Sequence, residues 1–253
     1  MITIYLDECG FTGEDLFNEE QPAFTMASLD LSENTCQKLK VKHFGNVKTK
    51  ELKHSGLARR VNQQNMVIEL IKDLFENYRY SVKFVVAHKR YVLITKIADY
   101  IIEPVLYDDG LNFYKDGLNI AYSNLLHLLL NSIASKSSFD KFLYKFQVMV
   151  REKTKKAYKD FFEPVLKNKF PDEINYLLLP IKLFDQRYGF SGIETLKRNT
   201  LDISLTSALM LMNKWKNYIS QNEILSLFMT VLLIWQSRKK FGMNLLNQPL
   251  SQR

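Results

Sequence analysis

The chain has 253 residues, a net charge of +8 and a pI near 9.2. Apolar residues make up 46% and charged residues 25%, which is ordinary for a globular protein able to bury a full core. The longest apolar run, 224–235, is shorter than the ~20 residues that cross a bilayer, so we expect no membrane partner. The basic balance favours nucleic acid as a partner, although a solvated basic surface explains it about as well.

The cysteine content places the protein in a reducing compartment. Cys9 and Cys36 are too few for a disulfide framework and do not have the spacing of a zinc site. Met1 leads directly into a strand pattern, without the charged and apolar regions of a signal peptide. We therefore expect a cytoplasmic protein.

The first predicted element is a strand that ends in two carboxylates. Residues 2–6 alternate with period two, Asp7 and Glu8 follow, and Gly10 and Gly13 form a turn. Alternation places Asp7 and Glu8 on opposite faces, so only one of them can point into a given site. A carboxylate at such a strand end is typical of metal-dependent phosphoryl transfer. The alternative is a strand that ends in solvated acids.

Further strands and helices follow in the first third of the chain. Residues 24–31 are predicted to be a strand antiparallel to the first, and 80–87 to be a third strand. Ser32 is predicted to start a short helix that ends near Lys42, and residues 57–77 have the pattern of an amphipathic helix. Between these helices, a basic connector presents Glu51.

From Tyr91 onward the apolar period becomes helical. Helices are predicted over 91–107, 118–134 and 201–218, with a single long helix over 139–166. Residues 167–192 are predicted to be irregular because they contain Pro171 and Pro180. A short αβ segment followed by a helical block predicts a mixed α/β protein.

Four segments, in this order, resemble a bacterial group known as the domain-of-unknown-function 3800 family. The opening Tyr5-Leu6-Asp7-Glu8-Cys9-Gly10 is similar to the family's Tyr-x-Asp-Glu-Ser-Gly, with Cys9 in place of Ser. The others are 50–55, the stretch 88–104, and 201–215. The resemblance implies a ribonuclease H-like mixed sheet with a large helical insertion. It divides the chain into N-terminal strands and first helices (1–90), the insertion (91–195) and a C-terminal part (196–253).

The resemblance also implies a metal site. Asp7 and Glu51 would hold Mg²⁺ or Mn²⁺, which activates a water and stabilises the leaving oxygen. Lys53 and His54 would contact phosphate or transfer protons beside Glu51. His88 and Lys89 end the third strand, where they would face the first strand as phosphate ligands or a general base. Each of these residues could instead be an ordinary surface residue.

The tail departs from the family pattern, which has a strand ending in His-Asp, the Asp being a third metal ligand. Here 223–235 is apolar without a clear period, and a basic run follows. Methionine has a single codon and threonine codons begin with AC. If the final G of the Met229 codon is read as the first base of a codon, the Met229-Thr230 junction reads GAC, which encodes Asp. The codon before it then encodes His or Tyr. We interpret the tail as the product of a frameshift near Asn222; the alternative is a coincidence that synonymous codons permit.

Three functional hypotheses follow from the sequence, the third being a hydrolase that acts on a small phosphorylated molecule. The first is a metal-dependent nuclease or phosphodiester hydrolase of ribonuclease H-like type, inactive as translated if the tail has replaced part of its core. The alternative is a non-catalytic module of the same fold that binds nucleic acid or protein. Under a frameshift, the apolar run 225–235 would be a surface for a protein partner or a second copy.

Overall fold

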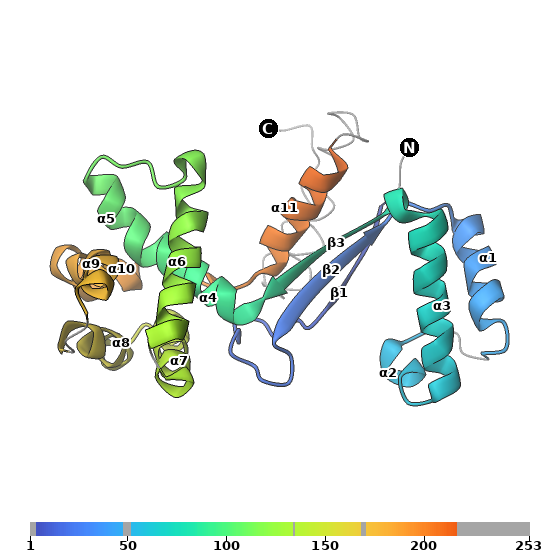
Figure 1. The fold of residues 1–253 in the computed structure, drawn as a ribbon, viewed down its shortest axis with the longest axis horizontal. Helices are drawn as coiled ribbons and strands as arrows, with labels where there is room; N and C mark the ends of the chain where they lie inside the picture. Colours follow the sequence, from blue (N-terminus) through green and yellow to red (C-terminus); the bar gives the residue numbers. More distant parts are fainter. Residues whose placement is uncertain (1–3, 48–51, 134, 168–170, 217–253) are drawn as a thin grey trace, which may run out of the picture. The chain divides into compact units, whose positions relative to one another are not determined.

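A computed structural model describes residues 4–47, 52–133, 135–167 and 171–216 of the protein (Figure 1). Its sheet has three antiparallel strands in the order β1-β2-β3. The strands are β1 (Tyr5–Cys9), β2 (Ala23–Leu29) and β3 (Val82–His88). The predicted strands and the antiparallel pairing of the first two are confirmed, and the protein is of the mixed α/β class with helix predominating.

Side-chain alternation along the strands follows the predicted period. In β2, Phe24, Met26 and Ser28 are buried, whereas Ala27 is exposed. In β1, Asp7 is exposed and Glu8 is partly buried, so the two carboxylates lie on opposite faces as predicted. The sheet thus has one well-covered face, formed by alternate residues of its strands.

The chain divides into two compact units, which are described separately. The sheet unit comprises the described residues of Met1–Glu8, Met26–Val85 and Ser204–Arg253. The helical unit comprises Cys9–Thr25 and Val86–Ile203. Each is assembled from segments that are distant in the sequence. The predicted insertion, 91–195, falls within the helical unit.

The helices of the sheet unit precede β3 or come at the end of the described chain. They are α1 (Glu33–Phe44), α2 (His54–Leu57), α3 (Val61–Asn77), a 3₁₀ turn (Arg79–Ser81) and α11 (Ser204–Trp215). The predicted cap is confirmed, because the Ser32 hydroxyl accepts a hydrogen bond from the Thr35 amide at 3.2 Å. The helix predicted over 57–77 begins later, at Val61.

A buried carboxylate joins α1 to α3. The Asp73 side chain accepts hydrogen bonds from Lys42 Nζ at 2.7 Å and Asn77 Nδ2 at 2.8 Å, and its Oδ2 lies 2.7 Å from His43 Nε2. Only 8% of Asp73 is exposed. These hydrogen bonds hold the pKa of Asp73 well below its usual range. The pair of helices is therefore held together by a satisfied charge as well as by Leu39 and other apolar contacts.

The apolar stripe of α3 is less buried than its period predicts. Val61, Ile68, Ile71 and Phe75 are 69%, 48%, 46% and 53% exposed. Asp73 is the buried side chain of this helix. Helical periodicity correctly predicted the helix, which contacts α1 and α2, but these four residues of its apolar stripe stay exposed within the described part of the chain.

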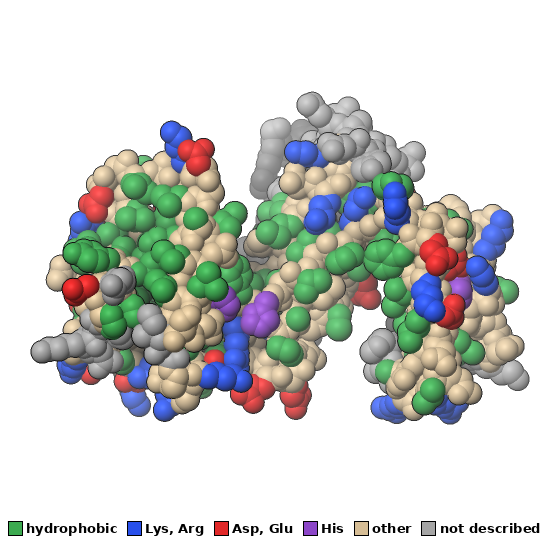
Figure 2. All heavy atoms as spheres, in the orientation of Figure 1, with side chains coloured by type: hydrophobic (Ala, Val, Ile, Leu, Met, Phe, Trp, Pro, Cys, Tyr) green, Lys and Arg blue, Asp and Glu red, His purple; other side chains and the backbone are tan. Residues whose placement is uncertain are grey.

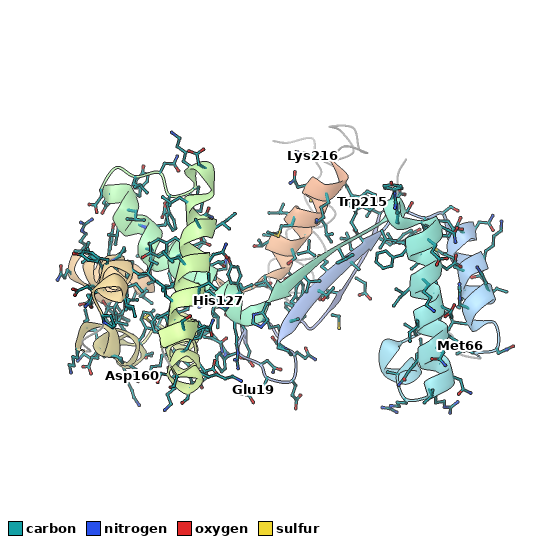
Figure 3. All side chains as sticks on the ribbon, in the orientation of Figure 1. Glu19, Met66, His127, Asp160, Trp215 and Lys216 are labelled. Atoms are coloured by element: carbon teal, nitrogen blue, oxygen red, sulfur yellow. The ribbon has the colours of Figure 1, made fainter. Side chains whose placement is uncertain are left out.

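Helix α11 covers the buried face of the sheet through Trp215 (Figure 3). The Trp215 indole N–H donates to Ser28 Oγ at 2.9 Å, and the Ser28 hydroxyl donates to the Lys83 carbonyl at 3.1 Å. The Lys83 ammonium lies 5.1 Å from the centre of the Trp215 ring. One indole thus contacts both β2 and β3, and only 2% of it is exposed.

The helical unit is packed around aromatic rings from several helices. Phe162 stacks on Phe184 with ring centres 6.0 Å apart, and the ring centres of Phe161 and Phe146 are 5.6 Å apart.

The elements of the helical unit are α4 (Lys89–Ile97), a π-helix (Ala98–Ile102), α5 (Glu103–Asp108), a 3₁₀ turn (Lys115–Gly117), α6 (Leu118–Ile133), α7 (Lys136–Glu152), α8 (Lys155–Lys167), α9 (Asp172–Arg187) and α10 (Gly189–Glu194). The helices predicted over 91–107 and 118–134 are confirmed.

The prediction of one long helix over 139–166 is wrong. Lys153 adopts φ 51°, a left-handed conformation that ends α7, and α8 starts two residues later. The Lys153 ammonium donates to the Leu196 carbonyl, which fixes the break. Lysine gives no sequence signal for this conformation, since glycine or asparagine usually occupies it.

The prediction of an irregular segment over 167–192 is also wrong, because 172–187 form α9. Pro180 lies inside the helix and cannot donate the backbone hydrogen bond of its turn. The Tyr122 hydroxyl donates to the Leu177 carbonyl, one turn before Pro180. This tertiary hydrogen bond ties α9 to α6 beside the Tyr176 carbonyl, which Pro180 leaves without its helical donor.

No helix in the described ranges has both the length and the apolar content needed to cross a bilayer. The apolar run 224–235 and the tail assigned to a frameshift lie outside the described residues.

We predict that Asp73 controls stability in acid. Because its folded pKa is depressed, the stability that it contributes is complete above the ordinary Asp value of ~3.9 and is lost as pH falls below that value. Asp73→Asn should be less stable than the wild type at pH 7 and should lose less further stability between pH 5 and pH 3. Urea unfolding followed by circular dichroism measures this.

Glu69→Gln is the matched control, because Glu69 pairs with Lys72 on the same helix but is 59% exposed. It should leave the acid dependence of unfolding unchanged. Equal acid dependence in Asp73→Asn and the wild type would contradict the assignment.

Candidate functional site

The predicted site residues are divided between the two units. Asp7 and Lys53 belong to the sheet unit, whereas His88 and Lys89 belong to the helical unit. Glu51 lies outside the described residues. His54 is the first residue of α2, and its side chain is outside the described part.

Asp7 is available to a ligand. It lies on the exposed face of β1, and within the described chain its carboxylate forms no hydrogen bond or ion pair. Glu8, on the other face, is partly buried and engaged with another group. Of the two adjacent carboxylates, Asp7 is therefore the one that can bind a cation.

The turn after β1 requires glycine at its first position. Gly10 has φ 80°, and a Cβ built there would lie 2.1 Å from the Ala23 carbonyl oxygen. Gly13 has φ 62°, but a Cβ there would meet no atom within 4 Å. The backbone of β2 thus passes directly against Gly10, which sets the path of the chain beyond Asp7.

Lys89 is the most unusual residue near this turn. Its side chain is 1% exposed, and its ammonium donates to Thr12 Oγ1 at 2.7 Å. Burial lowers the pKa of Lys89, whereas the nearby charges of Asp15 and Cys9 raise it. The Lys89 amide also donates to the Pro22 carbonyl at 3.0 Å, so the residue contacts both ends of the β1–β2 connection. A lysine held in this way fixes the connection and places a positive charge beneath it.

A buried amide anchors the same connection to α7. Gln147 Oε1 accepts hydrogen bonds from the Leu16 and Phe17 amides at 2.6 and 3.0 Å. Gln147 Nε2 donates to Asp15 Oδ1 at 3.0 Å. Sequence reasoning missed Gln147 because a glutamine in an amphipathic helix carries no local signal. Its 1% exposure shows its role.

His88 caps a helix. Its Nδ1 accepts a hydrogen bond from the Tyr91 amide at 3.4 Å, which makes His88 the N-cap of α4. The ring is exposed. The pKa of His127, labelled in Figure 3, is lowered mainly by the burial of His127 and also by the nearby charge of His88. The Nε2 atom is not used by the cap, so His88 still has the atom that a phosphate contact needs.

Lys53 lines a basic cavity that sequence reasoning did not predict as a unit. The cavity has a volume of about 360 Å³ and lies where α2 meets α3. Its described lining residues are Val47, Lys53, Gly56, Leu57, Arg59, Arg60 and Gln63. Figure 2 shows Lys and Arg side chains at this end of the helix pair. The adjacent arginines 59 and 60 were the sequence signal that could have found it.

Arg59 and Arg60, two of the charged residues of this cavity, are open to an anion. Among the described residues, no carboxylate pairs with Arg59 or Arg60. Helix α3 begins at Val61 without a side-chain cap, which leaves amide donors and the positive end of the helix dipole at the same place. Two guanidinium groups beside free amides are suited to phosphate.

A second acidic site lies on the π-helix of the helical unit. Burial raises the pKa of Asp99, and the pKa of Glu103 is raised by burial and by Asp99. The Tyr114 hydroxyl donates to Asp99 Oδ1 at 3.3 Å, and burial with these charges raises the pKa of Tyr114 to about 12. The nearby charge of Lys96 acts in the opposite direction and lowers the pKa of Asp99.

The described residues contain no group of three or more His, Cys, Asp or Glu side chains that could hold a metal ion. Cys9 and Cys36 are free thiols, as predicted. The chain matches no protein-family model, no curated protein and no solved structure. The resemblance based on Tyr5–Gly10 and the later segments therefore stays a prediction.

We predict that the two glycines of the turn differ in their tolerance of alanine. Gly13→Ala should cost about 1 kcal/mol, the price of a left-handed Cβ. Gly10→Ala should cost at least about 3 kcal/mol, because the β2 backbone must also move away. Urea unfolding of both variants measures the difference. Equal losses would show that Gly10 is not held against Ala23.

Proposed function

We propose that the protein is a cytoplasmic, divalent-metal-dependent nuclease or phosphodiester hydrolase of ribonuclease H-like type. The observation that carries the proposal is the exposed, uncommitted carboxylate of Asp7 in the middle of β1, the first strand of an antiparallel sheet, which extends beyond Asp7 to Cys9. Mg²⁺ or Mn²⁺ prefers such oxygen ligands, and bound metal would activate a water for attack on phosphorus. Glu51 is the proposed second ligand.

Two further features support phosphate chemistry. Lys53 shares its cavity with Arg59 and Arg60, which would bind the phosphodiester backbone. Lys89 places a buried ammonium against the turn that follows Asp7. Within the helical unit, His88 offers its Nε2 atom to a phosphate, and the buried Lys89 ammonium adds positive charge without contacting the ligand.

The basic cavity also favours a second candidate function, a non-catalytic module that binds nucleic acid. Uncompensated arginines at a helix start bind phosphate without any metal. The metal-dependent function requires Asp7, whereas the non-catalytic function does not.

We predict that Mn²⁺ binding depends on Asp7. In isothermal calorimetry the wild type should bind Mn²⁺, and Asp7→Ala should weaken binding at least tenfold, about 1.4 kcal/mol, because a charged ligand is lost. Cleavage of labelled RNA and DNA should fall in parallel. Asp160→Ala, which removes another exposed carboxylate, should bind as the wild type does.

Absence of Mn²⁺ binding by the folded wild type would contradict an active metal site in this chain. The same titration on a chain with the second reading frame restored after Asn222 then separates two cases. Binding regained there would assign the defect to the tail, whereas its continued absence would reject the metal-dependent function altogether.

We predict that Arg59 and Arg60 contribute to nucleic-acid affinity. The double variant Arg59→Gln, Arg60→Gln should bind a fluorescent single-stranded oligonucleotide about tenfold more weakly in EDTA. The slope of log affinity against log salt should fall by roughly 2, since two phosphate contacts are lost. Fluorescence anisotropy measures both. The matched control is the double variant Lys38→Gln, Lys40→Gln on α1. It should change the affinity and the salt slope less than the arginine double variant does.

A further inference from the structure

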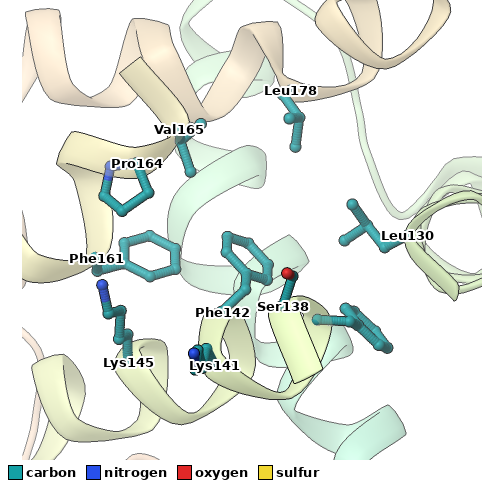
Figure 4. A pocket seen from close by; sticks show the side chains of 10 residues that line it. Leu130, Ser138, Lys141, Phe142, Lys145, Phe161, Pro164, Val165 and Leu178 are labelled. Atoms are coloured by element: carbon teal, nitrogen blue, oxygen red, sulfur yellow. The ribbon is translucent and has the colours of Figure 1, made fainter. Parts of the chain in front are cut away.

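The helical unit contains a cavity that none of the proposed chemistry uses. It has a volume of about 260 Å³ and lies among α7, α8, α9 and the end of α6 (Figure 4). Leu130, Phe142, Phe161 and Leu178 contribute to its walls, one from each of the four helices. The cavity is therefore formed entirely within one unit.

The walls of this cavity are apolar and firmly packed. Phe161, Val165 and Leu178 are 1%, 3% and 2% exposed. The Phe142 ring, which points from α7 into the cavity, lies 5.1 Å from the Phe161 ring. Side chains this deeply held keep their positions when a ligand enters, so the cavity is a preformed apolar site.

The rim of the cavity carries positive charge from one helix. Lys141 and Lys145 both line the cavity, and their spacing of four residues places them on the same face of α7. Two like charges at this spacing repel each other. Within the described residues, neither lysine has a carboxylate partner. Ser138, one turn earlier, is the one uncharged polar side chain among the described lining residues.

We propose that this cavity binds an amphipathic carboxylate of medium chain length. Its alkyl chain fills the apolar space, and its carboxylate lies between the ammonium groups of Lys141 and Lys145. The volume of about 260 Å³ is larger than the roughly 150 Å³ of an apolar cavity that holds the six carbons of benzene, so it has room for a chain of about eight carbons.

The lining excludes other ligand classes. A nucleobase needs several donors and acceptors on its edges, and the described walls offer one hydroxyl. A long lipid chain exceeds the volume. An alkyl carboxylate matches the size, the apolar walls and the charge together.

Titration of the full chain with hexanoate, octanoate and octan-1-ol by isothermal calorimetry tests the proposal. Octanoate should bind at one site, and affinity should rise about fourfold per methylene from hexanoate to octanoate. Lys141→Gln, Lys145→Gln should weaken octanoate at least fivefold and leave octan-1-ol unchanged. Ser138→Trp, at an exposed position, should fill the cavity and abolish both interactions without removing a core side chain.

Lys155→Gln, Lys159→Gln is the matched control, since these exposed lysines have the same spacing on α8 and do not line the cavity. It should bind octanoate as the wild type does. The proposal is overturned if the folded wild type shows no saturable octanoate binding or no dependence on chain length. It is also overturned if both lysine pairs reduce affinity equally, since binding is then nonspecific ion pairing.

Discussion

The buried amide of Gln147 is the interaction on which the arrangement around the first turn depends. One side chain satisfies two backbone amides and one carboxylate of a connection that has no regular structure of its own. Unpaired, each of these buried groups would cost about 1–3 kcal/mol. Arg90 supports the same connection, with its guanidinium 4.8 Å from the centre of the Phe17 ring and an ion pair to Asp140. The turn after Asp7 is consequently fixed to a helix far along the chain.

The buried ammonium of Lys89 becomes intelligible in this setting. A lysine whose pKa is lowered by burial costs stability at neutral pH, since the unfolded chain takes up the proton more readily. That cost is tolerated where the anchored connection supplies Thr12 as a hydrogen-bond acceptor and Asp15 as a nearby charge. Groups that reduce stability in this way are concentrated at functional sites.

Sequence reasoning performed best where one period dominates the local pattern. The strands, the Ser32 cap and the opposite faces of Asp7 and Glu8 all follow from alternation or capping chemistry. It failed at Pro180 and Lys153, where a tertiary hydrogen bond or a left-handed lysine overrides the local preference. These contacts come from residues distant in the sequence and leave no mark near the position they control.

The candidate site shows the same division. Lys53 was predicted to contact phosphate beside Glu51. That Arg59 and Arg60 line the same cavity depends on the turn between α2 and α3, which the sequence does not reveal. Lys89 was predicted to be near the first strand, and its hydrogen bond to Thr12 agrees with that position, but its burial had no sequence signal. Periodicity gives the element that carries a residue, whereas burial depends on what the rest of the chain places over it.

The contact between Trp215 and Ser28 spans 187 residues and has a consequence for synthesis. Every residue of the helical unit leaves the ribosome before α11 does, so that unit can fold while the covered face of the sheet still lacks its indole. Closing so long a loop is entropically costly and slow. The sheet, although it is translated first, is therefore the last part of the molecule to be completed, and during that interval it is the part most exposed to chaperones and proteases.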